Sequence, residues 1–388
     1  MPFYDLTEFL KLSAVLNYQL SAIQINWTGI ASILVGKNDL PEREREILVD
    51  VFEYINTIYG LRQRRLGARA VLHPLRVTAL MSEVSEDCDL LQYFTALLHD
   101  RFEDIEPERF LKDDHIIPDK GFESILEHLP ERERWFLMER LQWLTKRPGD
   151  SYYAYIGRFF EKAAQTPEVI RVKLADRLDN TLDMSIDLED PLEEVDFFEN
   201  IFQTLFNNSF KGTKTEVPHP AMAALNSAER LYQLFKNIIL MSLVRQKSAG
   251  AADPASKHLF ENLTVASIKE AQRIALHIFS YHETDVLTLR KLVRETMDYV
   301  YEGGIDTVTA PTGGSRLDGL FVSRFDDPVK ENLQSKLAEL FDDKHLMIQA
   351  AIAFIVIFMS FLNDSEYFVR GISAEGVQPA RDPHGSSA

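Results

Sequence analysis

The chain has 388 residues, which is enough for two or three domains with substantial cores. It carries 42 Lys and Arg against 60 Asp and Glu, and the net charge of −18 argues against nonspecific nucleic-acid binding, because that needs a basic surface. Cys88 is the only cysteine, which excludes an internal disulfide and a Cys-based zinc site.

The N-terminal part of the chain is predicted to be helical. Residues from about 6 to 35 form an apolar helical segment that ends at Gly36, and residues 1–40 are expected to be an N-terminal helical extension. A second helix is expected from about 42 to 59, closed by Gly60. The first residues lack a basic region before an apolar core, so we expect no secretory signal and a cytoplasmic location.

Helical patterns continue nearly everywhere after this, so the sequence predicts an all-α protein. A polar stretch at 207–220 indicates a boundary, with a first domain at 41–206 and an all-α C-terminal domain of unknown role at 221–371. A Gly-rich loop at 303–314 lacks the ending of a P-loop and is predicted to be a connector. Residues 372–388 are predicted to be a disordered tail.

The most apolar segment runs from Leu346 to Leu362. Its seventeen residues are at the short edge for a membrane span, because a bilayer core needs about 20 residues. We therefore expect a buried helix of the C-terminal domain. A membrane anchor or the seam of a homo-oligomer formed by the C-terminal helices remain the alternatives.

Three short segments carry residues suited to chemistry. Residues 171–180 read RVKLADRLDN, which places Asp176 and Asn180 on one face of a helix. Residues 99–104 read HDRFED at the end of an apolar helix, and His73 lies upstream, before a proline. Burying several carboxylates beside imidazoles without a counter-charge is costly, so a cation is expected.

Four side chains are the candidate metal ligands: His73, His99, Asp100 and Asp176. Two imidazole nitrogens and two carboxylates suit Mn, Fe or Zn better than Ca or Mg. The alternative is that His73 only packs at the start of its helix, while Glu103 and Asp104 form a solvated helix end.

The order and spacing of these segments resemble the HD-superfamily hydrolase domain of the RelA/SpoT type, which removes the 3′-pyrophosphate of guanosine tetra- and pentaphosphate. The shared features are a His, then HD with ED three residues beyond the Asp, then KLADR-L-x-N, over about residues 42–190. Residues 152–158, YYAYIGR, also resemble a Y-x-x-Y-I-x-R stretch of small stand-alone members. The resemblance implies an HD-domain helical bundle and a single Mn(II) held by the four candidate ligands.

The resemblance also implies roles for other residues. Glu103 and Asp104 match the pair that positions and deprotonates the attacking water, and Asn180 matches a contact to the sugar or phosphate side of the nucleotide. Lys173 and Arg177 would add positive charge for a pyrophosphate group. The candidate substrate-binding residues are Arg65, Lys173, Arg177, Asn180, Tyr152 and Arg158.

The chain departs from the family before His73. The family has an R-x-S-G-E-P-Y turn whose arginine stacks on guanine, whereas residues 64–73 here read RRLGARAVLH. Arg65 fits that pattern only if one residue is deleted. The other interpretation of this arginine-rich stretch is a solvated basic helix end.

The expected function is Mn-dependent hydrolysis of a phosphate ester or pyrophosphate on a small-molecule nucleotide, with guanosine tetraphosphate as the leading substrate. The alternatives are another nucleotide phosphohydrolase, such as an NADPH phosphatase, and a nucleotide-sensing regulatory HD protein. The intact Glu103 and Asp104 pair favours the enzyme, because a sensor needs no water-activating carboxylate.

Overall fold

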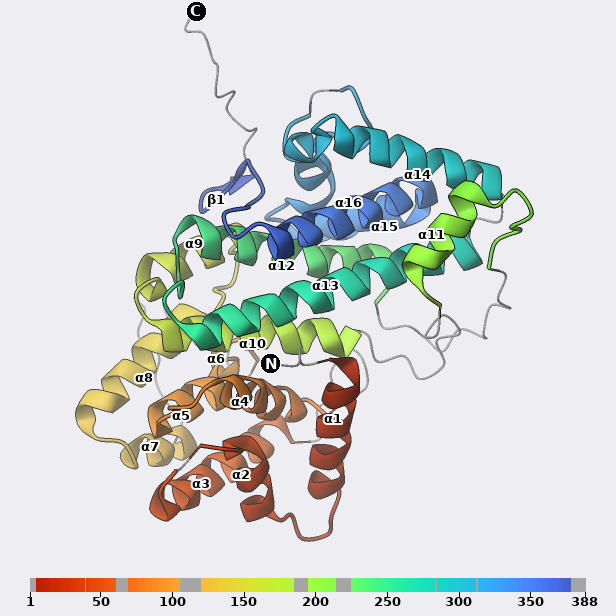
Figure 1. Ribbon diagram of the computed structural model, residues 1–388. Helices are drawn as coiled ribbons and strands as arrows, with labels where there is room; N and C mark the ends of the chain where they lie inside the picture. The colour runs from red at the N-terminus through yellow and green to blue at the C-terminus, as the bar shows by residue number, and fades with distance from the viewer. Residues whose placement is uncertain are drawn as a thin grey trace, which may run out of the picture. The chain divides into compact units, whose positions relative to one another are not determined.

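The computed structural model describes residues 5–38, 40–60, 69–104, 120–184, 195–213, 225–282, 285–311 and 313–377. Within these ranges it contains sixteen α-helices and a single two-stranded sheet, so the all-α prediction is confirmed (Figure 1). The chain forms two compact units, and each unit is assembled from segments that are separated in the sequence.

The first unit comprises Met1–Asp150, Arg158–Asp183 and Lys247–Leu263. The helices of these segments are α1 (Leu6–Leu20), α2 (Trp27–Val35), α3 (Glu42–Tyr59), α4 (Leu72–Val84), α5 (Leu90–Leu98), α6 (Arg101–Asp104), α7 (Lys120–Glu127), α8 (Glu131–Leu144), the second half of α9 (Tyr152–Ala163), α10 (Pro167–Met184) and the first turns of α13 (Pro254–Tyr281).

The second unit comprises Ser151–Gly157, Met184–Gln246 and Thr264–Ala388. Its elements are the first half of α9 and the rest of α13 together with α11 (Phe197–Phe206), α12 (Ser227–Gln246), α14 (Val286–Tyr301), the 3₁₀ turn η2 (Gly304–Thr307), the π turn η3 (Phe321–Phe325), α15 (Lys330–Asp342), α16 (Lys344–Asn363), β1 (Ile372–Ser373) and β2 (Gly376–Val377). The sequence-based division at 41–206 and 221–371 remains a proposal, and the compact units do not follow it.

The N-terminal helical segment is two helices rather than one. After α1 ends, Asn26 caps the start of α2, because its side-chain oxygen accepts a hydrogen bond of 2.9 Å from the Gly29 amide. A Cβ atom at position 29 would lie 2.8 Å from Asn26 Nδ2, so glycine lets this cap close. The next helix forms as predicted, since α3 begins at Glu42, ends at Tyr59 and is followed by Gly60, whose φ is 51°.

Buried helices enclose the centre of the first unit. All nine residues of α5 are buried, as are ten of the thirteen residues of α4, and the two helices pack against each other. Most of α10 is buried as well. Polar side chains on these three helices therefore lie in a dry environment, where they need partners.

Helix α16 contains the most apolar segment of the chain. Among the described residues it is the helix long and apolar enough to cross a membrane, but 72% of its apolar window is buried inside the structure. Phe354 packs on Phe321 and Phe325, with ring centroids 5.7 and 5.8 Å apart, and Phe358 is fully buried. This packing is that of the core helix expected from the sequence.

The prediction of disorder from residue 372 is wrong for the first six residues. Ile372 pairs with Val377, and Ser373 pairs with Gly376, in an antiparallel hairpin. The hairpin is anchored because Ile372 is buried and its carbonyl accepts a hydrogen bond of 2.7 Å from Gln246 Nε2. The rest of the predicted tail, residues 378–388, lies outside the described residues.

Candidate metal centre

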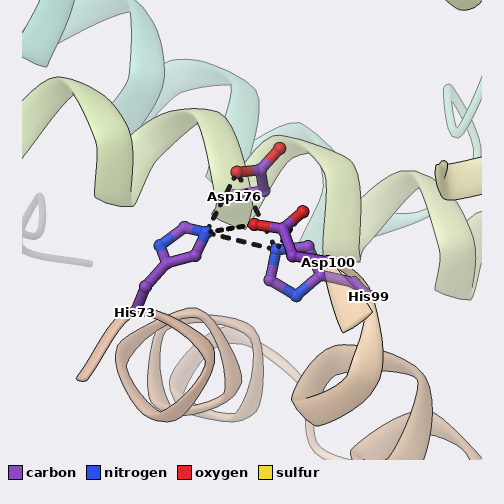
Figure 2. A group of neighbouring side chains, drawn as sticks. All are labelled: His73, His99, Asp100 and Asp176. Atoms are coloured by element: carbon purple, nitrogen blue, oxygen red, sulfur yellow. Dashed lines mark hydrogen bonds and ion pairs between the residues drawn. The ribbon is translucent and has the colours of Figure 1, made fainter. Parts of the chain in front are cut away.

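Three helical segments of the first unit bring the four candidate ligands together. His73 lies in the first turn of α4, His99 and Asp100 follow α5 directly, and Asp176 lies within α10. Their side chains point toward one another in Figure 2, and the ligand atoms all lie within 4.8 Å of one another. Asp100 is half-buried and the other three are buried.

The distances suit a small divalent ion. His73 Nε2 lies 3.2 Å from His99 Nε2, 3.1 Å from Asp100 Oδ2 and 3.4 Å from Asp176 Oδ1. When ligands surround an ion at about 2.1 Å, neighbouring ligand atoms are about 3.0 to 3.4 Å apart. These three distances around His73 Nε2 suit ligands of one ion, while His99 Nε2 lies farther, 3.9 Å, from Asp176 Oδ1.

Hydrogen bonds assign the tautomer of both imidazoles. His99 Nδ1 lies 2.7 Å from the Ala96 carbonyl, which can only accept, so this nitrogen carries the proton. His73 Nδ1 likewise faces a carboxylate, that of Asp179, at 2.6 Å. The lone pairs of both Nε2 atoms therefore face each other and two carboxylates. A cation bound between these four groups would reduce their mutual repulsion.

Both carboxylates of the cluster favour the ionised form. Burial alone would raise the pKa of Asp100, but the imidazoles of His99 and His73, whose Nε2 atoms lie 3.3 and 3.1 Å from its carboxylate, hold that pKa well below its usual range. Burial also opposes ionisation of Asp176, whose pKa is nevertheless lowered by Lys173 and by His73. Ionised carboxylates are the form that binds a metal.

The two candidate water-activating residues differ in their surroundings. Glu103 is half-buried on α6, and one of its oxygens accepts a hydrogen bond from the Lys146 amide. Burial, together with the nearby charge of Asp100, raises the pKa of Glu103 to about 7. Asp104 is exposed at the end of the same short helix. Of the two, Glu103 has the surroundings of a general base at neutral pH.

Two of the candidate substrate-binding residues contact Asp176. Lys173 Nζ lies 2.7 Å from Asp176 Oδ2, and Asn180 Nδ2 donates to Asp176 Oδ1 at 2.6 Å. Both contacts stay within α10, at spacings of three and four residues. Arg177 on the same helix is buried, with 4% of its surface exposed. Lys173 and Asn180 thus orient a candidate ligand.

The remaining candidates lie elsewhere. Arg158 Nη2 donates to Asp150 Oδ2 at 2.7 Å and to the Thr145 carbonyl at 3.3 Å, so it holds the loop that contains Lys146. Tyr152 belongs to the second unit, where its ring lies 6.0 Å from that of Tyr155. Arg65 lies outside the described residues.

Sequence reasoning missed a buried charged network behind His73. Asp179 accepts hydrogen bonds from Arg76 Nε at 2.7 Å and Arg76 Nη2 at 3.1 Å, and Arg76 Nη2 also donates to Asp183 at 2.8 Å. None of these three residues is more than 2% exposed. A signal was present, because Arg76 follows His73 by three residues and Asp179 follows Asp176 by three, which places them on shared helix faces.

Comparisons with known proteins agree with this geometry. Residues 71–181 match the HD domain family. The guanosine-3′,5′-bis(diphosphate) 3′-pyrophosphohydrolase of Aquifex aeolicus (strain VF5) is 28% identical over 144 residues, which are 36% of this chain and 18% of that protein. The chain therefore matches less than a fifth of the length of this relative. The matched HD residues contain all four clustered side chains.

Proposed function

The chain contains an HD domain of the RelA/SpoT phosphohydrolase type, a class of metal-dependent hydrolase, and we propose that it is a Mn(II)-dependent nucleotide pyrophosphohydrolase. The observation that supports this most directly is the convergence of two Nε2 atoms and two carboxylates within 4.8 Å. In this proposal His73, His99, Asp100 and Asp176 hold the ion.

A divalent ion bound there would polarise a phosphate oxygen and lower the pKa of water, which makes hydrolysis possible near neutral pH. Glu103 takes the proton of the attacking water, because its raised pKa keeps it basic enough to accept one. The Lys146 amide fixes the orientation of that carboxylate. Water adds to phosphorus as the ester bond breaks, and the leaving oxygen takes up the proton that Glu103 accepted from the water.

The proposed substrate is a nucleotide with a 3′-pyrophosphate, and guanosine tetraphosphate leads because the Aquifex relative is named for that reaction. Pyrophosphate would then leave from the 3′-oxygen. A cationic group near the centre is available in Lys173, which is held against Asp176. We further propose a cytoplasmic protein whose partners are nucleotides, with the C-terminal helices as the candidate surface for self-association.

A nucleotide sensor is the second candidate function. It is favoured by the size of the second compact unit, which lies largely outside the matched HD residues and could transmit a signal. The Glu103 environment favours the enzyme, because a binding-only site has no use for a carboxylate with a pKa near 7.

A product-release panel distinguishes these candidates. Purified protein is incubated with Mn(II) and guanosine tetraphosphate, NADPH or ordinary nucleoside phosphates, and pyrophosphate and phosphate are measured separately. His99→Ala serves as the control that removes a ligand. Pyrophosphate release from guanosine tetraphosphate supports the proposal, whereas phosphate release from NADPH alone supports the alternative hydrolase. Binding of a nucleotide without turnover of any would support the sensor.

A further inference from the structure

We propose that Asp179, held in place by Arg76, is a positioning residue that fixes the tautomer and orientation of His73 for metal binding. The inference rests on the proposed metal centre. It concerns residues beyond the four candidate ligands and the water-activating pair.

The contact between Asp179 and His73 is short and dry. Asp179 Oδ2 lies 2.6 Å from His73 Nδ1, and the side chains are 0% and 4% exposed. A carboxylate at this nitrogen holds the proton on Nδ1 and leaves the Nε2 lone pair facing the cluster. Hydrogen-bonded carboxylates behind histidine ligands fix the ring and increase its basicity as a ligand.

The Asp179 carboxylate is held toward His73, because Arg76 donates hydrogen bonds to both of its oxygens. Arg76 Nε donates to Oδ1 at 2.7 Å and Nη2 donates to Oδ2 at 3.1 Å. Asp183 accepts a further hydrogen bond from Arg76 Nη2 at 2.8 Å. Arg76 thus ties the carboxylate behind His73 to a second buried carboxylate.

The network is covered by a helix that lies outside the matched HD residues. The Arg76 guanidinium lies 4.7 Å from the centroid of the Phe9 ring, and Arg76 Nη1 lies 3.5 Å from Ser13 Oγ, both on α1. Phe9 is fully buried in this contact. The N-terminal helix therefore takes part in shielding the Arg76 guanidinium from water.

The same unit offers a matched control. Arg171 and Asp253 form another partly buried pair, with Nη2 to Oδ1 at 2.6 Å and Nε to Oδ2 at 2.9 Å. Asp253 contacts no candidate metal ligand in the described structure. Replacing each aspartate by asparagine removes one carboxylate from an arginine, but only Asp179→Asn changes the group behind His73.

The test is a titration with Mn(II) followed by the electron paramagnetic resonance signal of the free ion, for the wild type, Asp179→Asn and Asp253→Asn, each full-length and checked for folding by circular dichroism. Loss of the carboxylate behind a histidine ligand typically weakens metal affinity by about 10- to 100-fold, and we expect that loss for Asp179→Asn. Asp253→Asn should stay within about threefold of the wild type. Equal affinity of Asp179→Asn and the wild type would overturn the proposal.

If Asp179→Asn does not fold, the proposal is tested on the metal-free wild type instead. The ¹⁵N chemical shifts of the His73 imidazole show which ring nitrogen carries the proton. A protonated Nδ1 and an unprotonated Nε2 on His73 support the proposal, and the opposite tautomer refutes it. The readout is independent of turnover. A wild type that binds Mn(II) but hydrolyses no nucleotide would therefore refute the proposed function and leave this inference standing.

Discussion

Glu103→Gln is the substitution that tests the proposed chemistry most sharply. It keeps the size of the side chain and an oxygen that can accept the Lys146 amide hydrogen bond, but it removes the base. Positioned general bases typically contribute about 10²- to 10⁴-fold to a rate, so turnover should fall by at least about a hundredfold. Metal binding should be retained, because Glu103 is not among the four clustered ligands.

The pH profile gives a second measure of the same residue. Burial raises the pKa of Glu103 to about 7, so its ionised fraction would rise from about one tenth at pH 6 to about nine tenths at pH 8. A bound cation lowers this pKa, so the midpoint should lie at or below about 7. The wild-type rate should therefore fall as the pH is lowered through that midpoint, and the rate of Glu103→Gln should lose that dependence.

The assay measures kcat/KM for pyrophosphate release at saturating Mn(II), with metal occupancy checked at each pH. Asp104→Asn is the matched control, because it removes the neighbouring carboxylate, which is exposed. We expect Asp104→Asn to lose less activity than Glu103→Gln. The reasoning fails if Glu103→Gln turns over as fast as the wild type, or if Asp104→Asn alone abolishes the rate.

Three further outcomes are expected. His99→Ala should lose bound Mn(II) and turnover together, and elemental analysis that finds a full ion in this variant would contradict the ligand assignment. Burial opposes ionisation of Asp253, but hydrogen bonds from Arg171 and Ser256 lower its pKa to about 2. The ionised Asp253 therefore stabilises the fold above about pH 4, and this contribution is lost as the pH falls through about 2. In urea titrations, the Asp253→Asn variant should therefore have a lower free energy of unfolding than the wild type at pH 6. That free energy should also fall less steeply toward pH 2, and an unchanged slope with pH would count against the ion pair of Arg171 and Asp253. Phe358→Ala should lower the free energy of unfolding by about 3 to 5 kcal/mol, because the ring is fully buried, and a loss below about 1 kcal/mol would argue against α16 as a core helix.

The four clustered side chains could be identified from the sequence because their types are rare in apolar helices. His99 and Asp100 end a helix that is otherwise apolar, and Asp176 lies in the segment RVKLADRLDN, whose order and spacing resemble those of the HD-type hydrolases. Burying one such residue alone costs free energy, so the presence of several indicates that they share a binding partner such as a cation. The sequence could not show that Lys173 and Asn180 would contact Asp176, because the same charges suit a phosphate group equally well.

Features that depend on pairing across the chain were harder to predict. The bond from Arg76 to Asp179 spans 103 residues; Arg76 belongs to no recognisable motif, and Asp179 occupies the position that the pattern KLADR-L-x-N leaves unspecified. The hairpin at 372–377 was missed because its anchor is the distant Gln246, while its local composition is that of a loop. The break after α1 depends on a cap at Asn26, a residue that is also common inside loops.

The placement of the candidate ligands on three helices has a consequence for the lifetime of the protein. His73 and Asp176 are far apart in the sequence, so an ion held between them would bind the folded chain and not the unfolded one. At a free ion concentration of 100 times Kd, such binding adds about 2.7 kcal/mol to stability. The concentration of free metal ion would thus set how often the protein unfolds and how fast proteases degrade it. The melting temperature should rise with the Mn(II) concentration.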